Sequence, residues 1–559
     1  MNTLTLPRRL TAALSGLLLT AAAATAQTAP PAWTSARAVG SGSSAVGNAA
    51  VDAAGNLYEA GTFSGSTTVG GTTLTSQGST DGFLAKYASD GTVLWVRQLA
   101  SPGADYAYAV ALDAAGNAYL TGYFTGSVDL GNNLKLEGGT TTGRKLYCIR
   151  YSSQGQPEWV QQSTSANNNE SARGTGIALD AAGHVYVTGL LTRALTIGPT
   201  TIGEPTGLLS LQAGYVARFT AATGALEALT TAFTYPVPTT GSLSYFNPLI
   251  TASPTGQVYV LNRFEQSLLL PTTTPLTSTG DTDVAVLRYA PDGTLQWARQ
   301  FGSPARDEVS QTATDTAGNL YVAGLSFGSV TAGSVTLPNA GSADGLLLKY
   351  DATGTVEWAR PLGGPGFDKL SGLTLDAAGA PYVTGYFEQR VTMGTQTLTS
   401  AGGVDVLVAA YSPQGQFRWV QQAGGPGNDN GYYLGAAANG DLFVTGSFAW
   451  AATFGSLALT TTRSSETFVA RLGNAMLGTG SARPLALHLA PNPARGQVHL
   501  SGLPTGHPVQ ILDGLGRLVR TPHLPPDAIL SLQDLTPGLY LLRALDAQNQ
   551  PYAGRLVVE

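Results

Sequence analysis

A stretch of seven residues that recurs along the chain constrains its fold more than any other feature. It reads Asp-Ala-Ala-Gly-Asn-Leu-Tyr at residues 52–58. Further copies begin at Asp113, Asp180, Ser253, Asp315, Asp376 and Ala437, those at Ser253 and Ala437 being the least faithful. The steps between successive copies are 61, 67, 73, 62, 61 and 61 residues. A period of this length, built from short apolar runs and turn residues, is typical of a repeat architecture. The sequence therefore predicts seven structural units.

The second unit shows the order of elements within a repeat. Short apolar runs at Ala107–Asp113, Ala118–Phe124, Leu146–Tyr151 and Pro157–Gln161 predict four strands. The turns between paired strands carry glycine with Asn or Asp, or with Gln154, residues that suit hairpin turns. Four short antiparallel strands per unit, repeated seven times, predict an all-β fold, a seven-bladed β-propeller of four-stranded blades.

A tryptophan marks the fourth strand of most units, and its absence at the end of the array predicts how the ring closes. The tryptophans are Trp95, Trp159, Trp297, Trp358 and Trp419. The third unit has Ala228 instead, which predicts a locally irregular blade, and the seventh ends near Leu472 without a fourth strand. Residues 31–37, which contain Trp33, match the missing strand and precede the first unit. We expect this N-terminal strand to pair with Glu466–Leu472 and so remove the exposed sheet edges.

These units resemble the bacterial β-propeller repeat (SBBP-type) family. The matching segments are Asp105, Asp113–Asn117, Tyr119–Gly122, Asp81–Tyr87 and Trp95, with equivalents along residues 33–472. The resemblance implies the propeller fold. It implies little about function, because propellers host many unrelated activities.

The N-terminus has the features of an export signal. Arg8 and Arg9 precede an apolar run over residues 10–25, and small residues lead to a cleavage site before Gln27, so we expect a signal peptide over residues 1–26. No other segment is apolar and long enough to cross a bilayer.

Composition excludes several classes of partner. A net charge of −6 without a basic run argues against nucleic acid. The single cysteine, Cys148, excludes an intramolecular disulfide, and the five histidines lack zinc spacing. We therefore expect no metal and no cofactor.

The period stops at Pro484, and short strands at regular spacing predict a small β-sandwich over residues 484–559. This tail resembles the C-terminal sorting domain of type IX secretion substrates. The residues that carry the resemblance are Pro491, Asn492, Pro493, Asp513, Gly516, Arg517, Gly538 and Tyr540. Ala490 and Glu559 depart from the family's usual aromatic and basic residues. The resemblance implies that the type IX machinery exports the protein to the cell surface or the medium.

The predicted domain order is a signal peptide (1–26), a propeller (27–472), a linker (473–483) and the sorting domain (484–559). The linker is rich in Gly, Ser, Thr and Ala, which suits an exposed, cleavable segment.

Several recurring polar and aromatic positions are predicted to be structural. The turn aspartates (Asp52, Asp113, Asp180, Asp315 and Asp376) are expected to bond turn backbone rather than calcium. Acids at the start of the third strand (Asp81, Asp283, Asp344, Asp405 and Glu466) are expected to pair with basic residues later in that strand (Lys86, Arg288, Lys349 and Arg471). Phe63, Phe124, Phe264, Phe387 and Phe448 are expected in the core. Glu59 replaces an aliphatic residue, and we predict a rim position or a structural pair, with a site residue as the alternative.

A ligand-binding site is expected where the repeats differ, on the face that carries the longer loops. The candidate residues are Asp105, Tyr106, Glu170, Arg173, Arg306, Asp307, Asp368 and Asp429. Acids, amides and aromatic side chains together suit a carbohydrate, although they also suit solvated loops.

No catalytic constellation is visible, since there is no Gly-x-Ser-x-Gly elbow and no phosphate-binding loop. The first hypothesis is an exported, non-catalytic propeller that binds or adheres to polysaccharide or another cell-surface component. The alternative is a polysaccharide hydrolase or lyase that uses carboxylates near the channel, since their separation in space cannot be read from the sequence. A third hypothesis is a passive surface scaffold.

Overall fold

The computed structural model describes most of the chain. The described residues are 30–41, 44–138, 143–164, 171–203, 212–236, 246–271, 274–473, 485–501, 503, 505–513, 518–545 and 551–559. The expected signal peptide and residues 474–483 of the expected linker lie outside these ranges. The described residues form strands and no helices. They divide into two compact units, one of residues 36–470 and the other of residues 31–35 and 471–559.

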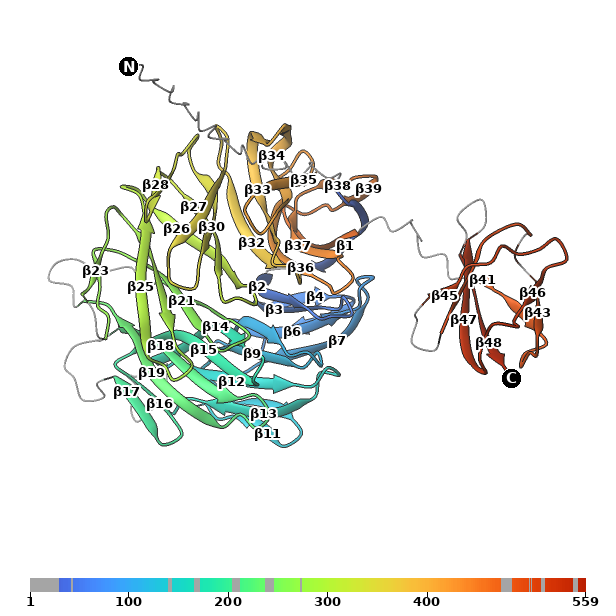
Figure 1. The fold of residues 1–559 in the computed structure, drawn as a ribbon. Coiled ribbons are helices and arrows are strands. Elements are labelled where there is room, and N and C mark those ends of the chain that lie inside the picture. The colour runs from blue at the N-terminus through green and yellow to red at the C-terminus, as the bar shows by residue number, and fades with distance from the viewer. Residues whose placement is uncertain are drawn as a thin grey trace, which may run out of the picture. The chain divides into compact units, whose positions relative to one another are not determined.

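Most repeats of the first unit form one antiparallel sheet of four main strands (Figure 1). The first repeat holds β2 (Ser44–Val51), β3 (Leu57–Phe63), β6 (Asp81–Tyr87) and β7 (Val93–Leu99); the second holds β8 (Tyr106–Leu112), β9 (Ala118–Phe124), β12 (Lys145–Tyr151) and β13 (Pro157–Gln162); the third holds β14 (Ser171–Leu179), β15 (His184–Thr192), β18 (Gln212–Thr220) and β19 (Leu226–Thr234).

The later repeats follow the same order. The fourth holds β20 (Leu249–Ala252), β21 (Val258–Phe264), β24 (Asp283–Tyr289) and β25 (Leu295–Gly302); the fifth holds β26 (Asp307–Thr314), β27 (Leu320–Ser326), β30 (Asp344–Tyr350) and β31 (Val356–Leu362); the sixth holds β32 (Lys369–Leu375), β33 (Pro381–Met393), β34 (Gln396–Tyr411) and β35 (Phe417–Ala423); the last holds β36 (Asn430–Ala436), β37 (Leu442–Phe448) and β40 (Glu466–Gly473). The four strands predicted in the second repeat are confirmed to within one residue at each end.

The N-terminal strand joins the last repeat. β1 (Ala32–Ser41) lies next to β40 in the sheet order β36-β37-β40-β1-β4-β5. The Thr34 hydroxyl donates to the carbonyl of Arg471 at 3.3 Å. Trp33 is buried, with 7% of its surface exposed. The predicted pairing of the Trp33 strand with Glu466–Leu472 is therefore present.

Small hairpins occupy most of the segments between the second and third main strands, which the sequence predicted only as Gly- and Thr-rich loops. They are β4 (Ser66–Val69) with β5 (Thr72–Thr75), β10 (Val128–Gly131) with β11 (Leu134–Leu136), β16 (Ala194–Ile197) with β17 (Thr200–Gly203), β22 (Ser267–Leu268) with β23 (Leu276–Thr277), β28 (Val330–Ala332) with β29 (Val335–Leu337), and β38 (Ala451–Phe454) with β39 (Leu457–Thr460). Two of them also join a main sheet, since β28 pairs with β25 of the preceding repeat and β4 pairs with β1. The other four form separate two-stranded sheets.

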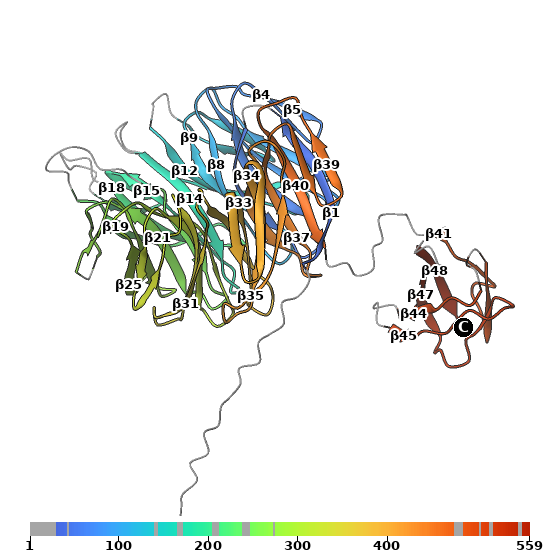
Figure 2. The ribbon, with the colours of Figure 1, turned by 90° about the horizontal axis from the view of Figure 1, so that it is seen from above.

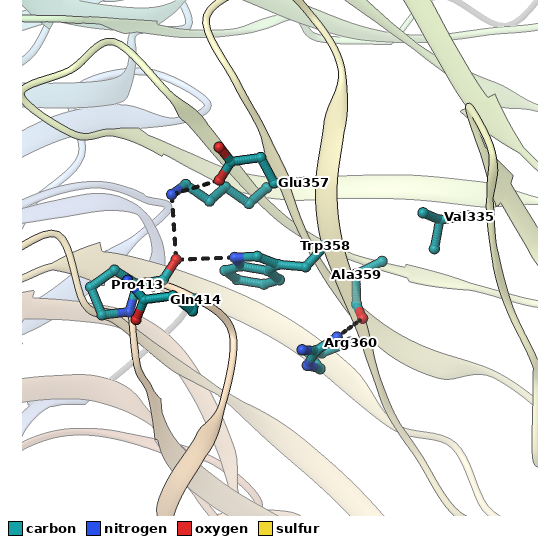
Figure 3. A pocket seen from close by; sticks show the side chains of 8 residues that line it. Val335, Glu357, Trp358, Ala359, Arg360, Pro413 and Gln414 are labelled. Carbon is teal, nitrogen blue, oxygen red and sulfur yellow. Dashed lines mark hydrogen bonds and ion pairs between the residues drawn. The ribbon is translucent and has the colours of Figure 1, made fainter. Parts of the chain in front are cut away.

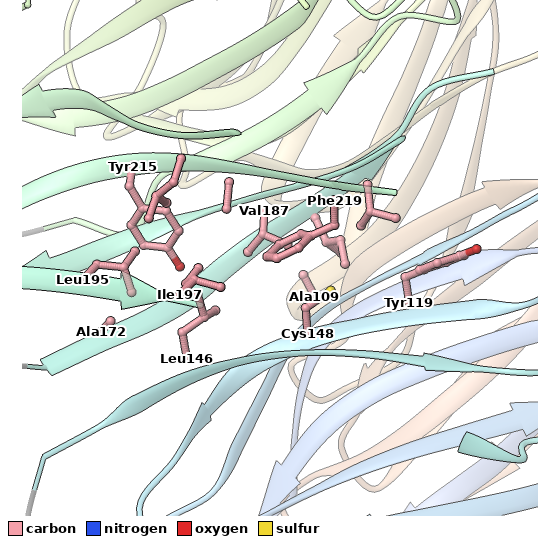
Figure 4. Close-up of a cluster of buried hydrophobic side chains, with 14 of the residues drawn as sticks. Ala109, Tyr119, Leu146, Cys148, Ala172, Val187, Leu195, Ile197, Tyr215 and Phe219 are labelled. Carbon is pink, nitrogen blue, oxygen red and sulfur yellow. The ribbon is translucent and has the colours of Figure 1, made fainter. Parts of the chain in front are cut away.

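The sheets fan around a common axis, with the first strand of each repeat innermost (Figures 1 and 2). Residues of β2, β8, β14, β20, β26, β32 and β36 line one cavity of about 400 Å³ on this axis. Apolar side chains fill the space between neighbouring sheets. Figure 4 shows one such layer, in which Tyr119 and Cys148 of the second repeat lie near Val187 and Phe219 of the third. The expected core aromatics at 63, 124, 264, 387 and 448 are all buried.

In four repeats the fourth-strand tryptophan attaches the sheet to a turn of the next repeat. Trp95 Nε1 donates to the carbonyl of Ser153 at 3.2 Å, and Arg97 Nε donates to the carbonyl of Gly155 at 2.6 Å. Gly155 has φ 76°, and a Cβ there would lie 2.7 Å from the Trp95 ring. This turn thus requires glycine for both its backbone and its packing. Trp297 and Trp358 bond the following repeat in the same way.

The second unit contains two sheets around one hydrophobic core. The larger has the order β41-β48-β47-β44-β45 and the smaller β42-β43-β46. The strands are β41 (Leu485–Ala486), β42 (His488–Ala490), β43 (Gln497–Ser501), β44 (Val509–Leu512), β45 (Leu518–Arg520), β46 (Ile529–Ser531), β47 (Gly538–Leu545) and β48 (Pro551–Val558). Val498 of the smaller sheet and Leu542 of the larger are both fully buried in this core. Two sheets on a shared core are the arrangement of a β-sandwich.

Candidate ligand-binding face

The start of each first strand and the end of each second strand meet at one end of every sheet. The register shows this directly, because Tyr106 pairs with Tyr123 and Asp307 pairs with Ser326. All the described candidate residues from the sequence lie at this end, which we call the loop face. Glu170 lies outside the described residues.

The four candidate aspartates on the loop face are buried. Asp105, Asp307, Asp368 and Asp429 each have 0% of their surface exposed. Asp368 accepts hydrogen bonds from the backbone of Gly364 at 2.6 Å and of Glu388 at 3.0 Å. Asp307 and Asp429 accept equivalent backbone bonds at 2.6 and 2.7 Å. These carboxylates therefore hold the loops in shape and do not face a ligand in this conformation.

Burial shifts the pKa of these four aspartates. Desolvation raises the pKa of Asp105, Asp307, Asp368 and Asp429 to about 6 in each case, against the bonds that they accept. Each also feels the charge of a buried aspartate at the start of the preceding repeat's third strand, namely Asp81, Asp283, Asp344 and Asp405 in that order. A backbone bond joins the two positions, for example from Asp105 N to the carbonyl of Thr80 at 2.8 Å. The loop-face aspartates thus mark the seams between sheets.

The turn aspartates lie at the opposite end of the strands. Asp52 Oδ1 accepts the backbone N–H of Ala54 at 3.0 Å and of Asn56 at 2.8 Å, which confirms the predicted turn role. The predicted pairing within the third strand is wrong. Lys86 Nζ lies 3.8 Å from Asp52, not beside Asp81. Since Asp81 and Lys86 are at opposite ends of β6, the strand itself separates them.

Tyr106, Tyr108, Tyr123, Arg144 and Arg173 form what we call the tyrosine–arginine cluster. Tyr106 stacks on Tyr123 with ring centroids 4.8 Å apart and on Tyr108 at 5.6 Å. The guanidinium of Arg144 lies 4.9 Å from the Tyr123 ring centroid. Arg173 is near enough to Tyr108 and Arg144 for their charges to shift its pKa, which desolvation lowers overall. The structure thus brings the candidates Tyr106 and Arg173 into one region.

A second group, the Glu308 cluster, gathers Glu308, Arg263, Arg306 and Lys369. Glu308 lies 2.9 Å from Arg263 and 3.4 Å from Lys369, and it also pairs with Arg306. These cations hold the pKa of Glu308 below its usual value despite burial, the largest single cause, which acts in the opposite direction. The structure therefore joins the candidate Arg306 to three residues of other loops and strands.

Aromatic rings surround the Glu308 cluster. Phe367 packs against Phe327 and Tyr386 with centroids 5.8 and 6.1 Å apart. Arg263 lies over Phe246, 4.3 Å from the ring centroid. A cavity of about 510 Å³ opens beside these residues. Its walls include Arg263, Glu308, Lys369, Tyr432 and Ser447. Rigid aromatic surfaces with a few placed polar groups are the usual make-up of a ligand site.

A pocket of about 710 Å³ on the fourth-strand side has a different character (Figure 3). It is lined by Glu357, Trp358 and Pro413, among others. The carbonyl of Pro413 accepts bonds from Trp358 Nε1 at 3.0 Å and from Lys349 Nζ at 3.3 Å, and Lys349 pairs with Glu357 at 2.9 Å. Its polar groups are thus engaged in attaching one repeat to the next, and we assign it no ligand.

Sequence reasoning missed Tyr108, Tyr123, Arg144, Arg263 and Tyr386. One signal could have found three of them. One position in the second strands varies between repeats, although Gly or Asn always precedes it and an apolar residue or serine always follows it. This position holds Thr62, Tyr123, Leu190, Arg263, Leu325, Tyr386 and Ser447. Such a variable position inside a constant motif, at the loop-face end of the strand, marks a surface that differs between repeats.

Glu59 is buried, with 4% of its surface exposed. Desolvation raises its pKa to about 7, and a hydrogen bond with Tyr87 opposes this shift. By strand alternation it faces the same way as Leu57 and Phe63, whose core includes Val39 and Val469. The structure therefore favours the predicted structural pair over a rim position.

The Pro-Asn-Pro segment of the second unit secures the last strand. Asn492 Nδ2 donates to the carbonyl of Arg555 at 2.7 Å, and Asn492 Oδ1 accepts the N–H of Val557 at 2.9 Å. Tyr540 donates to the carbonyl of Thr536 at 2.8 Å. Gly516 and Arg517 lie outside the described residues.

The described residues lack two features that would bear on the site. No group of three or more His, Cys, Asp or Glu side chains is placed to hold a metal ion there. Nor does that part of the chain contain a helix long and apolar enough to cross a membrane.

The chain is similar to known families and proteins over parts of its length. A β-propeller repeat family matches residues 94–126, and a secretion system C-terminal sorting domain matches residues 488–559. Regulatory protein FlaEY of Caulobacter vibrioides is 28% identical over 186 residues, which are 30% of this chain and 18% of that protein. An uncharacterized WD repeat-containing protein of Acanthamoeba polyphaga mimivirus is 26% identical over 193 residues, 29% of this chain and 13% of that one. This chain thus spans less than a fifth of either relative.

Among solved structures, a chain of the Mitotic Checkpoint Complex matches with a TM-score of 0.38 and 9% identity, over 84% of this chain and 99% of that one. The two family matches agree with the repeats and the two-sheet tail described above. This protein therefore carries a β-propeller repeat and a C-terminal sorting domain of the type IX secretion system, which indicates export to the cell surface or the medium.

Proposed function

We propose that the protein is a non-catalytic propeller that binds polysaccharide through its loop face. The observation that carries this proposal is the clustering of half-exposed aromatic rings with arginines on that face, beside cavities of about 400 and 510 Å³. Loops on a rigid scaffold are where binding sites usually lie. Tyrosines offer flat apolar area together with hydroxyl groups, which suits the faces and the edges of sugar rings.

We infer that the repeats close into a seven-bladed ring. Two observations support this. The first strands of the seven repeats line a single cavity, and β1 is hydrogen bonded to β40 of the last repeat on one side and to β4 of the first repeat on the other. Such a strand links the two ends of the array, so that neither end leaves a free sheet edge.

Removal of Trp33 tests the closure. Trp33→Ala is expected to lower the free energy of unfolding by about 3–5 kcal/mol, the usual cost for a buried tryptophan. The measurement is urea unfolding of the mature chain. Trp450 is 56% exposed and is the matched control, so Trp450→Ala should change stability by less than about 0.5 kcal/mol. Equal effects of the two variants would contradict closure by β1.

A hydrolase or lyase that uses loop-face carboxylates is the competing function. Glycoside cleavage usually needs one carboxyl that donates a proton and another that stays ionised, both in reach of the substrate. The loop-face aspartates 105, 307, 368 and 429 are fully buried, and Glu308 is paired with three cations. These observations favour binding over cleavage.

We also propose the domain limits 1–26, 27–472, 473–483 and 484–559. Intact-mass measurement of the protein recovered from the medium tests both expected cleavages. A mature N-terminus at Gln27 and a C-terminus between residues 473 and 484 are the expected results, and retention of either end would contradict that limit.

Thermal unfolding of the mature chain with a panel of polysaccharides tests the binding function. A ligand that binds only the folded state at a hundredfold excess over its dissociation constant stabilises by about 2.7 kcal/mol. A selective rise in the melting temperature supports a binding module, and analysis of the incubated polymer for new chain ends then separates binding from cleavage. No shift with any polymer would argue against the proposal and favour a scaffold.

A further inference from the structure

The tyrosine–arginine cluster brings together side chains from four segments. Tyr106 and Tyr108 lie on β8, Tyr123 lies on β9, Arg144 directly precedes β12, and Arg173 lies on β14. Tyr106 and Tyr108 are half-buried, so parts of their stacked rings face solvent, whereas Tyr123 lies beneath them and is 4% exposed. The buried Asp105 holds the loop on which this stack begins. The result is a supported aromatic platform.

The two arginines beside this platform have no acidic partner in the described part of the chain. Among the described residues no carboxylate lies within ion-pair distance of Arg144 or Arg173, whereas Arg263, Arg306 and Lys369 share Glu308. Nε of Arg173 is buried and makes no hydrogen bond with any described residue. Desolvation lowers the pKa of Arg173, and the charge of the neighbouring Arg144 lowers it further. A partly desolvated guanidinium beside a second cation is costly, and a bound anion would remove that cost.

We propose that the tyrosine–arginine cluster is the subsite for an acidic sugar, which bears a carboxylate or a sulfate, in the polysaccharide that the loop face binds. This inference rests on the proposed binding function and names its ligand class. The sugar ring stacks on the exposed faces of Tyr106 and Tyr108. Its anionic group takes charge-assisted hydrogen bonds from Arg144 and Arg173, for which the planar guanidinium fork is suited.

The net charge of the whole chain does not favour binding of an acidic polymer, so such binding depends on a local site. The net charge is −6, so long-range forces repel a polyanion rather than attract it. Binding of an acidic polymer therefore requires a site where positive charge is concentrated. Within the described loop face, the Glu308 cluster holds its cations against a carboxylate, and the tyrosine–arginine cluster does not.

Matched pairs of polymers test the proposal by isothermal titration calorimetry with the mature full-length chain. Polygalacturonate is compared with its highly methyl-esterified form, and dextran sulfate with dextran. The acidic member of at least one pair should bind at least tenfold more tightly than its neutral counterpart. The pair that shows the difference tells whether the anionic group is a carboxylate or a sulfate.

Three variants locate the site. Arg144→Gln and Tyr106→Ala should each weaken binding of the acidic polymer at least tenfold. Arg390 is exposed and, like Arg144, has no acidic partner among the described residues. Arg390→Gln removes the same charge elsewhere and should leave affinity within about twofold. Because the Arg144 side chain is exposed, its variant should keep the wild-type melting temperature, so a loss of binding cannot come from unfolding.

The outcomes separate this inference from the proposed function. Equal binding of acidic and neutral polymers, unchanged by Arg144→Gln, would overturn the acidic subsite and leave polysaccharide binding standing. Equal losses for Arg144→Gln and Arg390→Gln would also overturn it, because general charge would then explain the binding. Failure of all four polymers to bind would contradict the proposed polysaccharide-binding function, and the acidic subsite would then be contradicted with it.

Discussion

The two clusters on the loop face both place cationic side chains beside aromatic rings, and they differ in whether those cations have a carboxylate partner. In the Glu308 cluster, one carboxylate with 12% of its side-chain surface exposed forms ion pairs with Arg263, Arg306 and Lys369. In the tyrosine–arginine cluster, Arg144 and Arg173 lie against three stacked tyrosines, and no described carboxylate pairs with them. Equivalent ends of the strands in a repeat scaffold can therefore hold cations that are paired with a carboxylate in one place and cations without a described carboxylate partner in another.

Part of this difference arises at one position in the repeat. The residue after the seam aspartate is Tyr106 in the second repeat, Glu308 in the fifth and Lys369 in the sixth. The aspartate before each is buried and bonded to backbone, so the next side chain is projected toward the loop face in the same way. One variable residue on a constant support decides whether the local surface is aromatic, acidic or basic.

Among changes to the two clusters, removal of the Glu308 carboxylate should have the largest effect on stability. Glu308→Gln leaves three cations without a partner and should lower the free energy of unfolding by about 1–3 kcal/mol, below the cost of a fully buried pair because the partners are partly exposed. The variant should also gain affinity for the acidic polymer, since it converts this cluster into a second cationic and aromatic surface. Urea unfolding and calorimetry measure the two effects. A variant as stable as the wild type would show that the ion pairs contribute nothing.

A rise in pH should decrease the stability that the seam aspartates contribute and increase the stability that Glu308 contributes. Burial raises the pKa of Asp105 and Asp307 from the ordinary value of 3.8 to about 6. At a pH well below 3.8 each carboxyl is protonated in both the folded and the unfolded state, and at a pH above 6 each is ionised in both states. Stability from these groups therefore falls as pH rises from about 4 to about 6, by about 2 kcal/mol per aspartate. The pKa of Glu308 is lowered, so its contribution is lost as pH falls below its ordinary value of 4.5.

Urea midpoints between pH 4 and pH 7 check this prediction. The wild type should be most stable near pH 4.5. Asp105→Asn should show a smaller loss of stability between pH 5 and pH 7, and Glu308→Gln a smaller loss below pH 4.5. A wild-type profile that rises steadily from pH 5 to pH 7 would contradict the raised pKa of the seam aspartates.

Removal of a cation from the tyrosine–arginine cluster should have the smallest effect on stability. Arg173→Gln relieves a partly desolvated charge beside Arg144, so the free energy of unfolding should stay unchanged or rise by at most about 1 kcal/mol. Thermal unfolding without ligand measures this. A loss as large as that of Glu308→Gln would mean that Arg173 has a structural partner and that the two clusters do not differ as described.

Short-range chemistry made much of the fold predictable. The main strands of the second repeat follow from apolar runs bounded by turn residues, and Asp52 bonds the backbone of its own turn, two and four residues along the chain. The intervening hairpins were not predicted. Their sequences are rich in Thr and Gly, and β28 is held by pairing with β25 of the preceding repeat, which no local pattern indicates.

The candidate site was predictable in place but not in detail. The sequence located Tyr106, Arg173 and Arg306 at the end of the strands where loops vary. It also proposed Asp105, Asp307, Asp368 and Asp429 as ligand-binding residues, and the structure places them in the seams. From the sequence alone, an aspartate in a variable loop is expected to be exposed. These aspartates are buried because the loop packs beside the third strand of the neighbouring repeat.

The sequence by itself determined the repeats, their strands, the turn aspartates and the sorting tail, because each depends on residues that are close together in the chain. Only the tertiary structure decided that Lys86 pairs with Asp52, and that Arg144 and Arg173 share a tyrosine platform while Arg263, Arg306 and Lys369 share a carboxylate. Those arrangements join side chains from different strands and different repeats. Coulomb energy and desolvation depend on distances and burial that exist only once the sheets have packed.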